Sequence, residues 1–182
     1  NVLHHEGISR ISVVTGYKSV QLEQFLKKHY KNIQIINNEE YESTNSAYSF
    51  MKAMSSLQSK SYIHLNCDIL FSQSLLSKII NDPNKNVIAV RDDLIFDNAM
   101  ENIISIDDRV VNMSLRSTPE TLYKGYGLAK IDSKALQENV ANYLKLTSEV
   151  QKKENYYGLI RMSLGNQDYH VCRSNKYNLA EI

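Results

Sequence analysis

The sequence predicts a mixed α/β fold, in which a Rossmann-like, mostly parallel sheet is flanked by helices. Short apolar runs alternate with segments of helical spacing along the first half of the chain. These runs are rich in β-branched residues and have the length of strands. The 182 residues include 42% hydrophobic and 23% charged residues, which suits one sizeable core. We therefore expect a single domain over residues 1–182.

The first half of the chain alternates strands and helices. Strands are expected at residues 8–15, 32–36, 61–65 and 87–91. Helices are expected at residues 19–30, 45–57 and 75–80. The first helix should be capped by Ser19, with an apolar face made of Val20, Leu22, Phe25 and Leu26. Strand–helix–strand order favours parallel strands joined by right-handed crossovers.

After residue 91 the pattern changes to shorter strands, which we expect to be partly antiparallel. They are expected at residues 103–106, 109–113 and 122–131, with Asp107-Asp108 as the turn between the first two. Helices at 133–146 and 148–164 and a last strand at 169–172 complete the pattern.

Composition excludes several classes of protein. With 21 Lys and Arg against 20 Asp and Glu, the net charge is +1, which gives no broad footprint for nucleic acid or acidic membranes but leaves a local basic patch open. Cys67 and Cys172 form no disulfide framework and no C-x-x-C pair. No apolar run approaches the ~20 residues of a membrane span. We expect no signal peptide, because residues 1–5 lack a basic region followed by a long apolar one. We expect a cytoplasmic protein that binds small molecules, not nucleic acid or membranes. Its oligomeric state stays open.

Candidate site residues follow the strands at their carboxyl ends, where open α/β sheets bind ligands. Asp68 comes directly after an apolar strand, where a carboxylate can hold Mg²⁺ against substrate phosphates. A turn or helix-cap role is the alternative for Asp68. Gly16 ends the first strand, where the simplest explanation is a positive φ.

The segment Thr44-Asn45-Ser46 opens the helix expected at 45–57. Backbone N–H groups and short polar side chains at such a start suit a phosphate or a base edge. Plain capping is the alternative.

The sequence does not indicate a catalytic histidine, a reactive cysteine or a common catalytic motif. His64 lies within an expected strand and is interpreted as a structural histidine, and Cys67 has no identifiable cationic partner that would activate it. The sequence contains no nucleophile elbow, H-E-x-x-H or P-loop motif. The stretch Lys152-Lys153-Glu154 is interpreted as a solvated helix face.

Three segments, taken in order, resemble the sugar-phosphate and phosphocholine nucleotidyltransferases. They are G-I-S-R-I-S-V-V-T-G-Y-K (7–18), N-x-E-Y-x-S-T-N-S-A-Y-S (38–49) and S-Y-I-H-L-N-C-D-I-L-F (61–71). The middle segment looks most like the branch that contains CTP:phosphocholine cytidylyltransferase. Residues 122–131 look like the strand with the family's substrate-facing glycine, and residues 178–182 like its closing E-I-D segment.

The resemblance implies a nucleotide-diphospho-sugar transferase-like fold and Mg²⁺-dependent transfer of a nucleotidyl group, CMP from CTP, to a phosphorylated small molecule with release of pyrophosphate. It implies that Asp68 is the metal ligand and catalytic residue. Nucleotide-binding positions would be Gly16, Thr44, Asn45 and Ser46. Acceptor-binding positions would be Tyr126, Gly127 and Tyr156, although a pair of aromatic residues on a helix is also typical of a core. The product would be a CDP-activated building block for a surface polysaccharide or lipid.

The chain also departs from the family pattern. The N-terminal G-x-G-x-R-[LM] loop is absent, and the second metal aspartate would follow Ile182. Glu101 and Leu115 stand where lysines are frequent, so Glu101 would oppose a triphosphate. Three hypotheses follow. The chain is an active enzyme whose domain is incomplete at both ends, or it is a catalytically degenerate binding or interaction module. The missing glycine-rich first loop also leaves open an unrelated flavodoxin-like or methyltransferase-like α/β domain, which the three matching segments disfavour.

Overall fold

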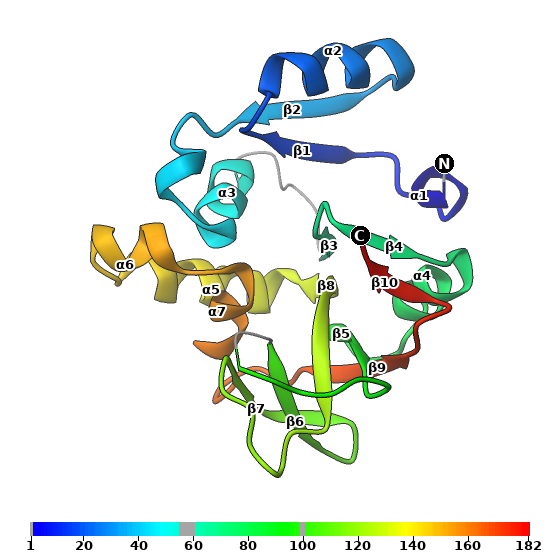
Figure 1. Ribbon diagram of the computed structural model, residues 1–182, viewed down its shortest axis with the longest axis vertical. Coiled ribbons are helices and arrows are strands. Elements are labelled where there is room, and N and C mark those ends of the chain that lie inside the picture. Colours follow the sequence, from blue (N-terminus) through cyan, green and yellow to red (C-terminus); the bar gives the residue numbers. More distant parts are fainter. Residues whose placement is uncertain (1, 55–60, 99–100) are drawn as a thin grey trace. The chain divides into compact units, whose positions relative to one another are not determined.

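The computed structural model describes residues 2–54, 61–98 and 101–182 (Figure 1). The chain forms two compact units. The first unit comprises Asn1–Gln58 and Val140–Leu159, and the second comprises Ser59–Asn139 and Ile160–Ile182. Helices α5 (Ser133–Leu144) and α7 (Tyr156–Arg161) each pass from one unit into the other.

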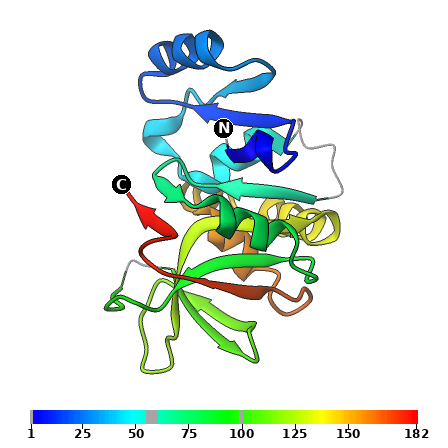
Figure 2. The same ribbon diagram turned by 90° about the vertical axis from the view of Figure 1, so that its right-hand side faces the viewer.

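The first unit contains a small parallel sheet covered by a helix (Figure 2). After a short helix α1 (Val2–His5), strands β1 (Ile11–Thr15) and β2 (Ile33–Asn37) pair in parallel, and α2 (Ser19–His29) connects them. This confirms the expected strand–helix–strand unit. Ser19 is not the cap, however: Lys18 precedes the helix in the left-handed conformation with φ 51°, and Ser19 is the first helical residue.

The apolar face expected for α2 is only partly buried. Leu26 is buried, whereas Val20 is 66% and Phe25 is 52% exposed. A sheet of two strands is too narrow to cover the whole apolar stripe of a helix, so one row of side chains packs and its neighbours remain at the surface.

The rest of the first unit is helical. It contains η1 (Tyr41–Ser43), α3 (Ser46–Ala53) and α6 (Ser148–Lys153). The single helix expected at 148–164 is wrong, because α6 ends where Glu154 adopts an extended conformation. The side chain of Asn155 then accepts a hydrogen bond of 2.8 Å from the amide of Gly158 and so starts α7.

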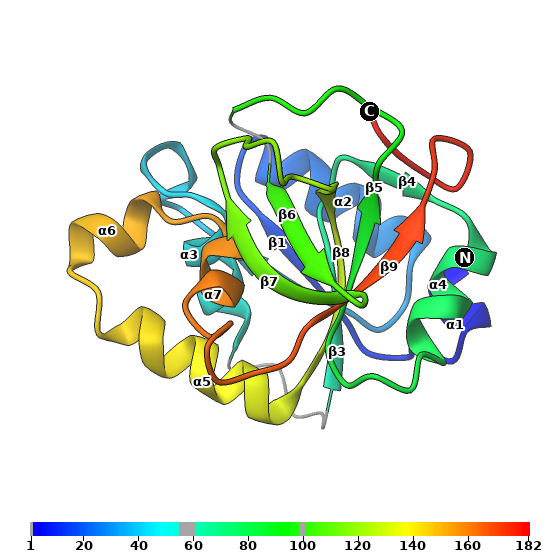
Figure 3. The ribbon, with the colours of Figure 1, turned by 90° about the horizontal axis from the view of Figure 1, so that it is seen from below.

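The second unit is built on a mixed six-stranded sheet of order β3-β8-β5-β9-β7-β6 (Figure 3). Its strands are β3 (Ser61–Leu65), β5 (Val87–Arg91), β6 (Asn102–Ile106), β7 (Arg109–Ser114), β8 (Tyr123–Asp132) and β9 (His170–Ser174). Strand β8 is antiparallel to β3, β5 and β6, whereas β5 and β9 are parallel. Strands β3, β5 and β9 therefore run in one direction, and their carboxyl ends lie at the edge where β8 begins. The mixed α/β class is confirmed, but the expected mostly parallel sheet is wrong: among the described strands of this sheet only β5 and β9 pair in parallel, because β8 inserts antiparallel between β3 and β5.

One turn and one pair of short strands show which elements local sequence signals can predict. Asp107 and Asp108 have φ values of 48° and 61° and close the β6–β7 hairpin, as expected for a tight two-residue turn. Strands β4 (Ile69–Phe71) and β10 (Leu179–Glu181) were not expected, because three residues are too few to show a period. They pair antiparallel, and α4 (Gln73–Ile80) follows β4 after its cap Ser72.

Within the described ranges, no helix combines the length and the apolar character that crossing a bilayer would need.

Candidate functional site

Asp68 lies in the turn between β3 and β4, beyond the carboxyl end of β3. It is exposed, and its backbone carbonyl accepts a hydrogen bond of 2.8 Å from the amide of Ile182. In the part of the chain that the structure describes, its carboxylate has no hydrogen-bond or ion-pair partner. Both carboxylate oxygens are thus available to a ligand.

Gly127 on β8 contacts the loop that leads to Asp68. Its carbonyl accepts a hydrogen bond of 2.7 Å from the amide of Asn66, and its φ is 71°. A Cβ at this position would lie 2.3 Å from Cγ of Asn66. Only glycine permits both this φ and this close approach. The structure therefore brings two predicted site residues, Asp68 and Gly127, together through Asn66, which the sequence analysis did not single out.

His64 supports the same loop from β3. Its Nε2 lies 3.0 Å from Oδ1 of Asn66, and burial lowers the pKa of His64 to about 4. The imidazole is therefore neutral at physiological pH, which agrees with its interpretation as a structural histidine.

Tyr126, next to Gly127, is a buried residue with two cations over its ring. The ring centroid lies 4.9 Å from Cζ of Arg91 and 4.5 Å from Nζ of Lys124. The sequence analysis missed both cations. The available signal was an arginine at the carboxyl end of a continuously apolar strand, where a buried charge needs a partner.

The polar side chains of Thr44, Asn45 and Ser46 form hydrogen bonds within the first unit. The hydroxyl of Thr44 donates to the carbonyl of Glu40 at 2.8 Å. Asn45 caps α3 by accepting from the amide of Ser46 at 2.7 Å. The hydroxyl of Ser46 accepts from the amide of Tyr156 at 2.8 Å. The capping alternative therefore holds for Asn45, and the role of the segment toward a nucleotide remains a prediction.

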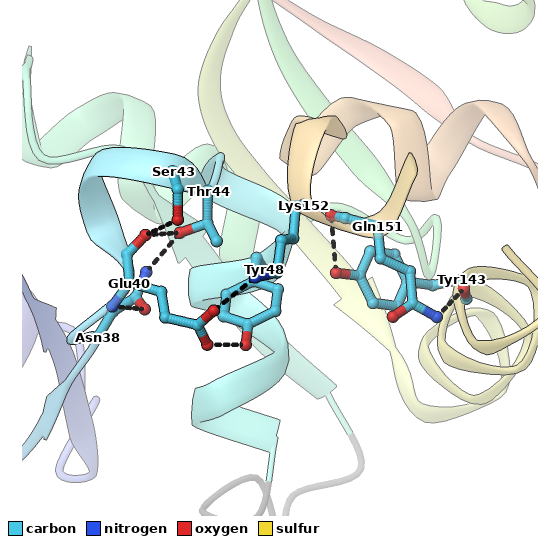
Figure 4. A network of polar contacts seen from close by, with 8 residues as sticks. All are labelled: Asn38, Glu40, Ser43, Thr44, Tyr48, Tyr143, Gln151 and Lys152. Carbon is cyan, nitrogen blue, oxygen red and sulfur yellow. Dashed lines mark hydrogen bonds and ion pairs between the residues drawn. The ribbon is translucent and has the colours of Figure 1, made fainter. Parts of the chain in front are cut away.

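Glu40 anchors a network of polar contacts that joins this segment to α6 (Figure 4). Its carboxylate accepts from Nζ of Lys152 at 2.6 Å and from the hydroxyl of Tyr48. The hydrogen bond from Lys152, followed by that from Tyr48, lowers the pKa of the Glu40 carboxyl. Asn38 donates from Nδ2 to the hydroxyl of Thr44 at 3.0 Å.

The stretch Lys152-Lys153-Glu154 is not simply a solvated face, which corrects the expectation. Backbone carbonyls of Lys152 and Glu154 accept hydrogen bonds of 2.8 Å and 3.2 Å from the amides of Asn45 and Ala47. The segment binds the start of α3 because α6 ends beside it, a long-range contact that charge patterning does not reveal.

Gly16 and Tyr156 differ from expectation in their local roles. The positive φ is at Lys18, not at Gly16. Glycine is needed at position 16 because a Cβ would lie 2.6 Å from Cβ of Tyr41. Tyr156 is 2% exposed and packs edge-on against Phe50, with ring centroids 5.1 Å apart. It contributes to the core of the first unit.

The negative charge of Glu101 is compensated, contrary to the expectation from the sequence. Its carboxylate oxygens lie 2.5 Å and 2.7 Å from Nη1 of Arg161, and its side chain is 4% exposed. Leu115, the other departure from the family pattern, is exposed.

Among the described residues, no group of three or more His, Cys, Asp or Glu side chains is placed to hold a metal ion. Glu181, near Asp68 in the β4–β10 ladder, is ion-paired with Lys124 at 2.6 Å. One free carboxylate is the protein contribution typical of a Mg²⁺ ion held mainly by substrate phosphates.

The predicted site residues thus divide between the units. Asp68, Tyr126 and Gly127 belong to the second, whereas Gly16, Thr44, Asn45, Ser46 and Tyr156 belong to the first.

A family model described as "Domain of unknown function (DUF6564)" matches residues 2–113. The chain belongs to the DUF6564 family. No curated protein matches the sequence of this DUF6564 protein.

Solved structures with the same fold are nucleotidyltransferases by name. The inositol-1-phosphate CTP transferase from T. maritima has a TM-score of 0.79 and 19% identity, with 100% of the DUF6564 chain and 73% of that chain covered. The CTP:phosphocholine cytidylyltransferase LicC from Streptococcus pneumoniae has a TM-score of 0.75 and 16% identity, with 100% and 76% covered. A protein assigned as a glucose-1-phosphate thymidylyltransferase from Bacillus anthracis, in complex with a sucrose, has a TM-score of 0.75 and 11% identity, with 99% and 73% covered. At these identities the likeness shows the fold, which is that of the sugar-phosphate nucleotidyltransferases. The resemblance of the three sequence segments is confirmed at this level.

Proposed function

We propose that this DUF6564 protein transfers a nucleotidyl group from a nucleoside triphosphate, CTP in preference, to a phosphorylated small molecule with release of pyrophosphate. The observation that carries the proposal is the exposed carboxylate of Asp68, without a partner among the described residues, at the carboxyl edge of the second unit's sheet. The fold supports it, because two of the structures above are named as CTP transferases and the third as a thymidylyltransferase.

The reaction needs no side-chain nucleophile. An oxygen of the acceptor phosphate attacks the α-phosphorus, and the bond from that phosphorus to the bridging oxygen of the β-phosphate breaks as pyrophosphate leaves. Mg²⁺, when bound, neutralises the charge that develops on the phosphate oxygens. Asp68 would hold that ion, while the Gly127–Asn66 contact would fix the loop that carries Asp68. Catalysis of this kind depends on positioning and electrostatics.

The preference for CTP rests on the hydrogen-bond donors of the Thr44-Asn45-Ser46 segment that are not used within the protein. Asn45 donates one amide hydrogen of Nδ2 to the carbonyl of Lys153 at 3.1 Å, which leaves the second hydrogen for a ligand. The hydroxyl of Ser46 accepts from Tyr156 and retains its own hydrogen for donation. Two donors suit the O2 and N3 acceptors of cytosine.

The test is pyrophosphate release by the purified protein with each of four nucleoside triphosphates, Mg²⁺ and a panel of phosphorylated acceptors. We expect activity highest with CTP, lost in EDTA, and reduced on the order of 100-fold or more in Asp68→Asn. Asp107→Asn is the matched control, since Asp107 lies at a hairpin turn where asparagine is equally suited. Undiminished turnover by Asp68→Asn would overturn the role of Asp68.

A second candidate function is a non-catalytic binding module. The internal hydrogen bonds of Thr44, Asn45 and Ser46 favour it, because they use donors and acceptors that a nucleotide would otherwise engage. Calorimetry with each triphosphate and Mg²⁺, together with the turnover assay, distinguishes the enzyme from the binding module. Heat of binding without turnover supports the module, and turnover excludes it.

A further inference from the structure

The side chain of Asn66 follows β3 directly, two residues before Asp68, and it is held from two sides. Its Oδ1 lies 3.0 Å from Nε2 of His64. Its Cγ and Nδ2 pack against Gly127, where a Cβ would lie only 2.3 Å and 2.4 Å from them. The backbone amide of Asn66 also donates to the carbonyl of Gly127 at 2.7 Å. The Asn66 side chain is therefore fixed between β3 and β8.

The contact with His64 determines which end of the Asn66 amide faces the protein. An amide oxygen accepts hydrogen bonds and cannot donate them, so Nε2 of His64 carries the hydrogen of this bond. Burial lowers the pKa of His64 to about 4, so the neutral ring carries its one hydrogen on Nε2. Because the oxygen of the amide binds His64, its NH2 group is directed away from that ring.

This NH2 group is a hydrogen-bond donor that the protein does not use. Nδ2 of Asn66 carries two hydrogens, and it makes no hydrogen bond with any residue that the structure describes. The residue is half-buried, so part of its side chain is open to a ligand. A ligand that brings an acceptor atom to these hydrogens gains hydrogen bonds with a group that is already oriented.

Asn66 and Asp68 are close enough to contact the same ligand. Two residues span at most about 7 Å of chain. Mg²⁺ at a single carboxylate such as that of Asp68 is held mainly by phosphate oxygens, so phosphates are expected beside this turn. A phosphate oxygen is a charged acceptor, and hydrogen bonds to charged acceptors are the stronger ones. The donors of Asn66 therefore lie where a phosphate group is expected.

We infer that Asn66 binds a phosphate oxygen of the substrate through its amide hydrogens, and that His64 is the positioning residue that orients this amide. The inference rests on the proposed function and adds a second substrate-binding side chain beside Asp68. The phosphate belongs either to the nucleotide or to the acceptor, and these two sources give different results in the experiments.

The first experiment observes the side-chain amide of Asn66 in the wild-type protein by nitrogen–proton correlation NMR. Its two hydrogens are assigned by the loss of their signals in Asn66→Asp. We expect the signals to shift on addition of CTP with Mg²⁺ or of an acceptor phosphate, for which glycerol 3-phosphate and phosphocholine are used. The compound that shifts them is the source of the phosphate. Signals that stay unchanged while CTP binds and is turned over would overturn the inference.

The second experiment removes the donors. Asn66→Asp keeps the size of the side chain and an oxygen toward His64, but it has no amide hydrogens. We expect the Kd for the compound that shifts the Asn66 signals, measured by calorimetry, to rise about tenfold or more. Cys67→Asp is the matched control, because Cys67 is exposed and the substitution adds the same charge to the same turn while leaving Asn66 intact. An equal rise in both variants would attribute the effect to charge and overturn the inference.

The third experiment tests the role of His64 and does not depend on the folding of Asn66→Asp. His64→Gln keeps an N–H donor for Oδ1 of Asn66, whereas His64→Leu does not. We expect His64→Leu to raise the same Kd about threefold or more and His64→Gln to remain near the wild-type value. A purely structural role of the imidazole would affect both variants alike, so equal values for the two would overturn the orienting role.

Failure of the inference and failure of the proposed function give different results. Binding of CTP that shifts the Asn66 signals without any turnover supports the inference and overturns the transfer reaction. Turnover that is equally efficient in wild type and Asn66→Asp overturns the inference and leaves the transfer reaction standing. Absence of binding by every nucleoside triphosphate and acceptor overturns both.

Discussion

The amide of Ile182 donates a hydrogen bond of 2.8 Å to the carbonyl oxygen of Asp68. Strand β10 thereby holds the turn that carries the free carboxylate. The strand itself is anchored from the sheet, because Lys124 binds Glu181 and Arg91 binds the carbonyl of Leu179. The placement of Asp68 thus depends on residues of β5, β8 and β10 that are distant in sequence.

Lys124→Met should weaken the attachment of β10 to the sheet, because it removes the ion pair with Glu181. The Lys124 side chain is only 13% exposed but Glu181 is 45% exposed, so we expect a loss of roughly 0.5–1.5 kcal/mol in the free energy of unfolding in urea. If the proposed function is correct, the Mg²⁺ concentration that gives half-maximal activity should rise as well. Lys153→Met, which removes an exposed pair with Glu149, should change neither quantity. Equal effects of the two variants would contradict the anchoring role of Lys124.

Gly127→Ala should be far more destabilising than Gly7→Ala. Both glycines have positive φ, 71° and 78°, but a Cβ at Gly7 meets nothing within 4 Å while one at Gly127 overlaps Asn66. We expect about 1 kcal/mol for the strained φ at Gly7 and about 3 kcal/mol or more at Gly127, where the overlap with Asn66 adds to it. Thermal or urea unfolding measures the difference. Similar losses at the two positions would show that Asn66 moves aside without cost.

The Glu40–Lys152 contact should make stability depend on pH in the acid range. Lys152 and Tyr48 lower the pKa of Glu40 from its ordinary value of 4.5. A lowered native-state pKa means that the stabilisation is complete above the ordinary value and is lost as the pH falls through the native one. We therefore expect wild type to lose stability more steeply than Glu40→Gln below about pH 4.5. Parallel pH profiles from pH 6 to 3 would contradict this.

Arg161→Met should be strongly destabilising because it removes the cation that is paired with a buried carboxylate. The Glu101 side chain is 4% exposed, and removal of one partner of a buried ion pair costs about 3–5 kcal/mol. The double variant Glu101→Leu/Arg161→Met should recover much of that loss. Arg109→Met, at an exposed pair with Asp168, should cost less than about 1 kcal/mol. A double variant no more stable than Arg161→Met would argue against charge burial as the cause.

Strong local patterns were sufficient to predict several elements. Strands β3 and β5 have the expected bounds, because each is a short apolar run followed by polar turn residues. The Asp107-Asp108 turn was predicted from residues that tolerate positive φ. The break between α6 and α7 was missed, because helical periodicity continues across Asn155 and only the cap geometry shows that a new helix begins there.

The sequence by itself determined the mixed α/β class and the position of Asp68 directly after a buried strand, since both follow from local periodicity. Tertiary structure decided which groups surround that strand end. Arg91, Lys124 and Tyr126 meet only because β8 lies between β3 and β5, and Ile182 reaches Asp68 only because β10 pairs with β4. Strand order is set by packing over the whole sheet, and no local pattern encodes it. For the same reason Thr44, Asn45 and Ser46 read as ligand-binding groups in sequence, while their internal hydrogen-bond partners are known only from the folded chain.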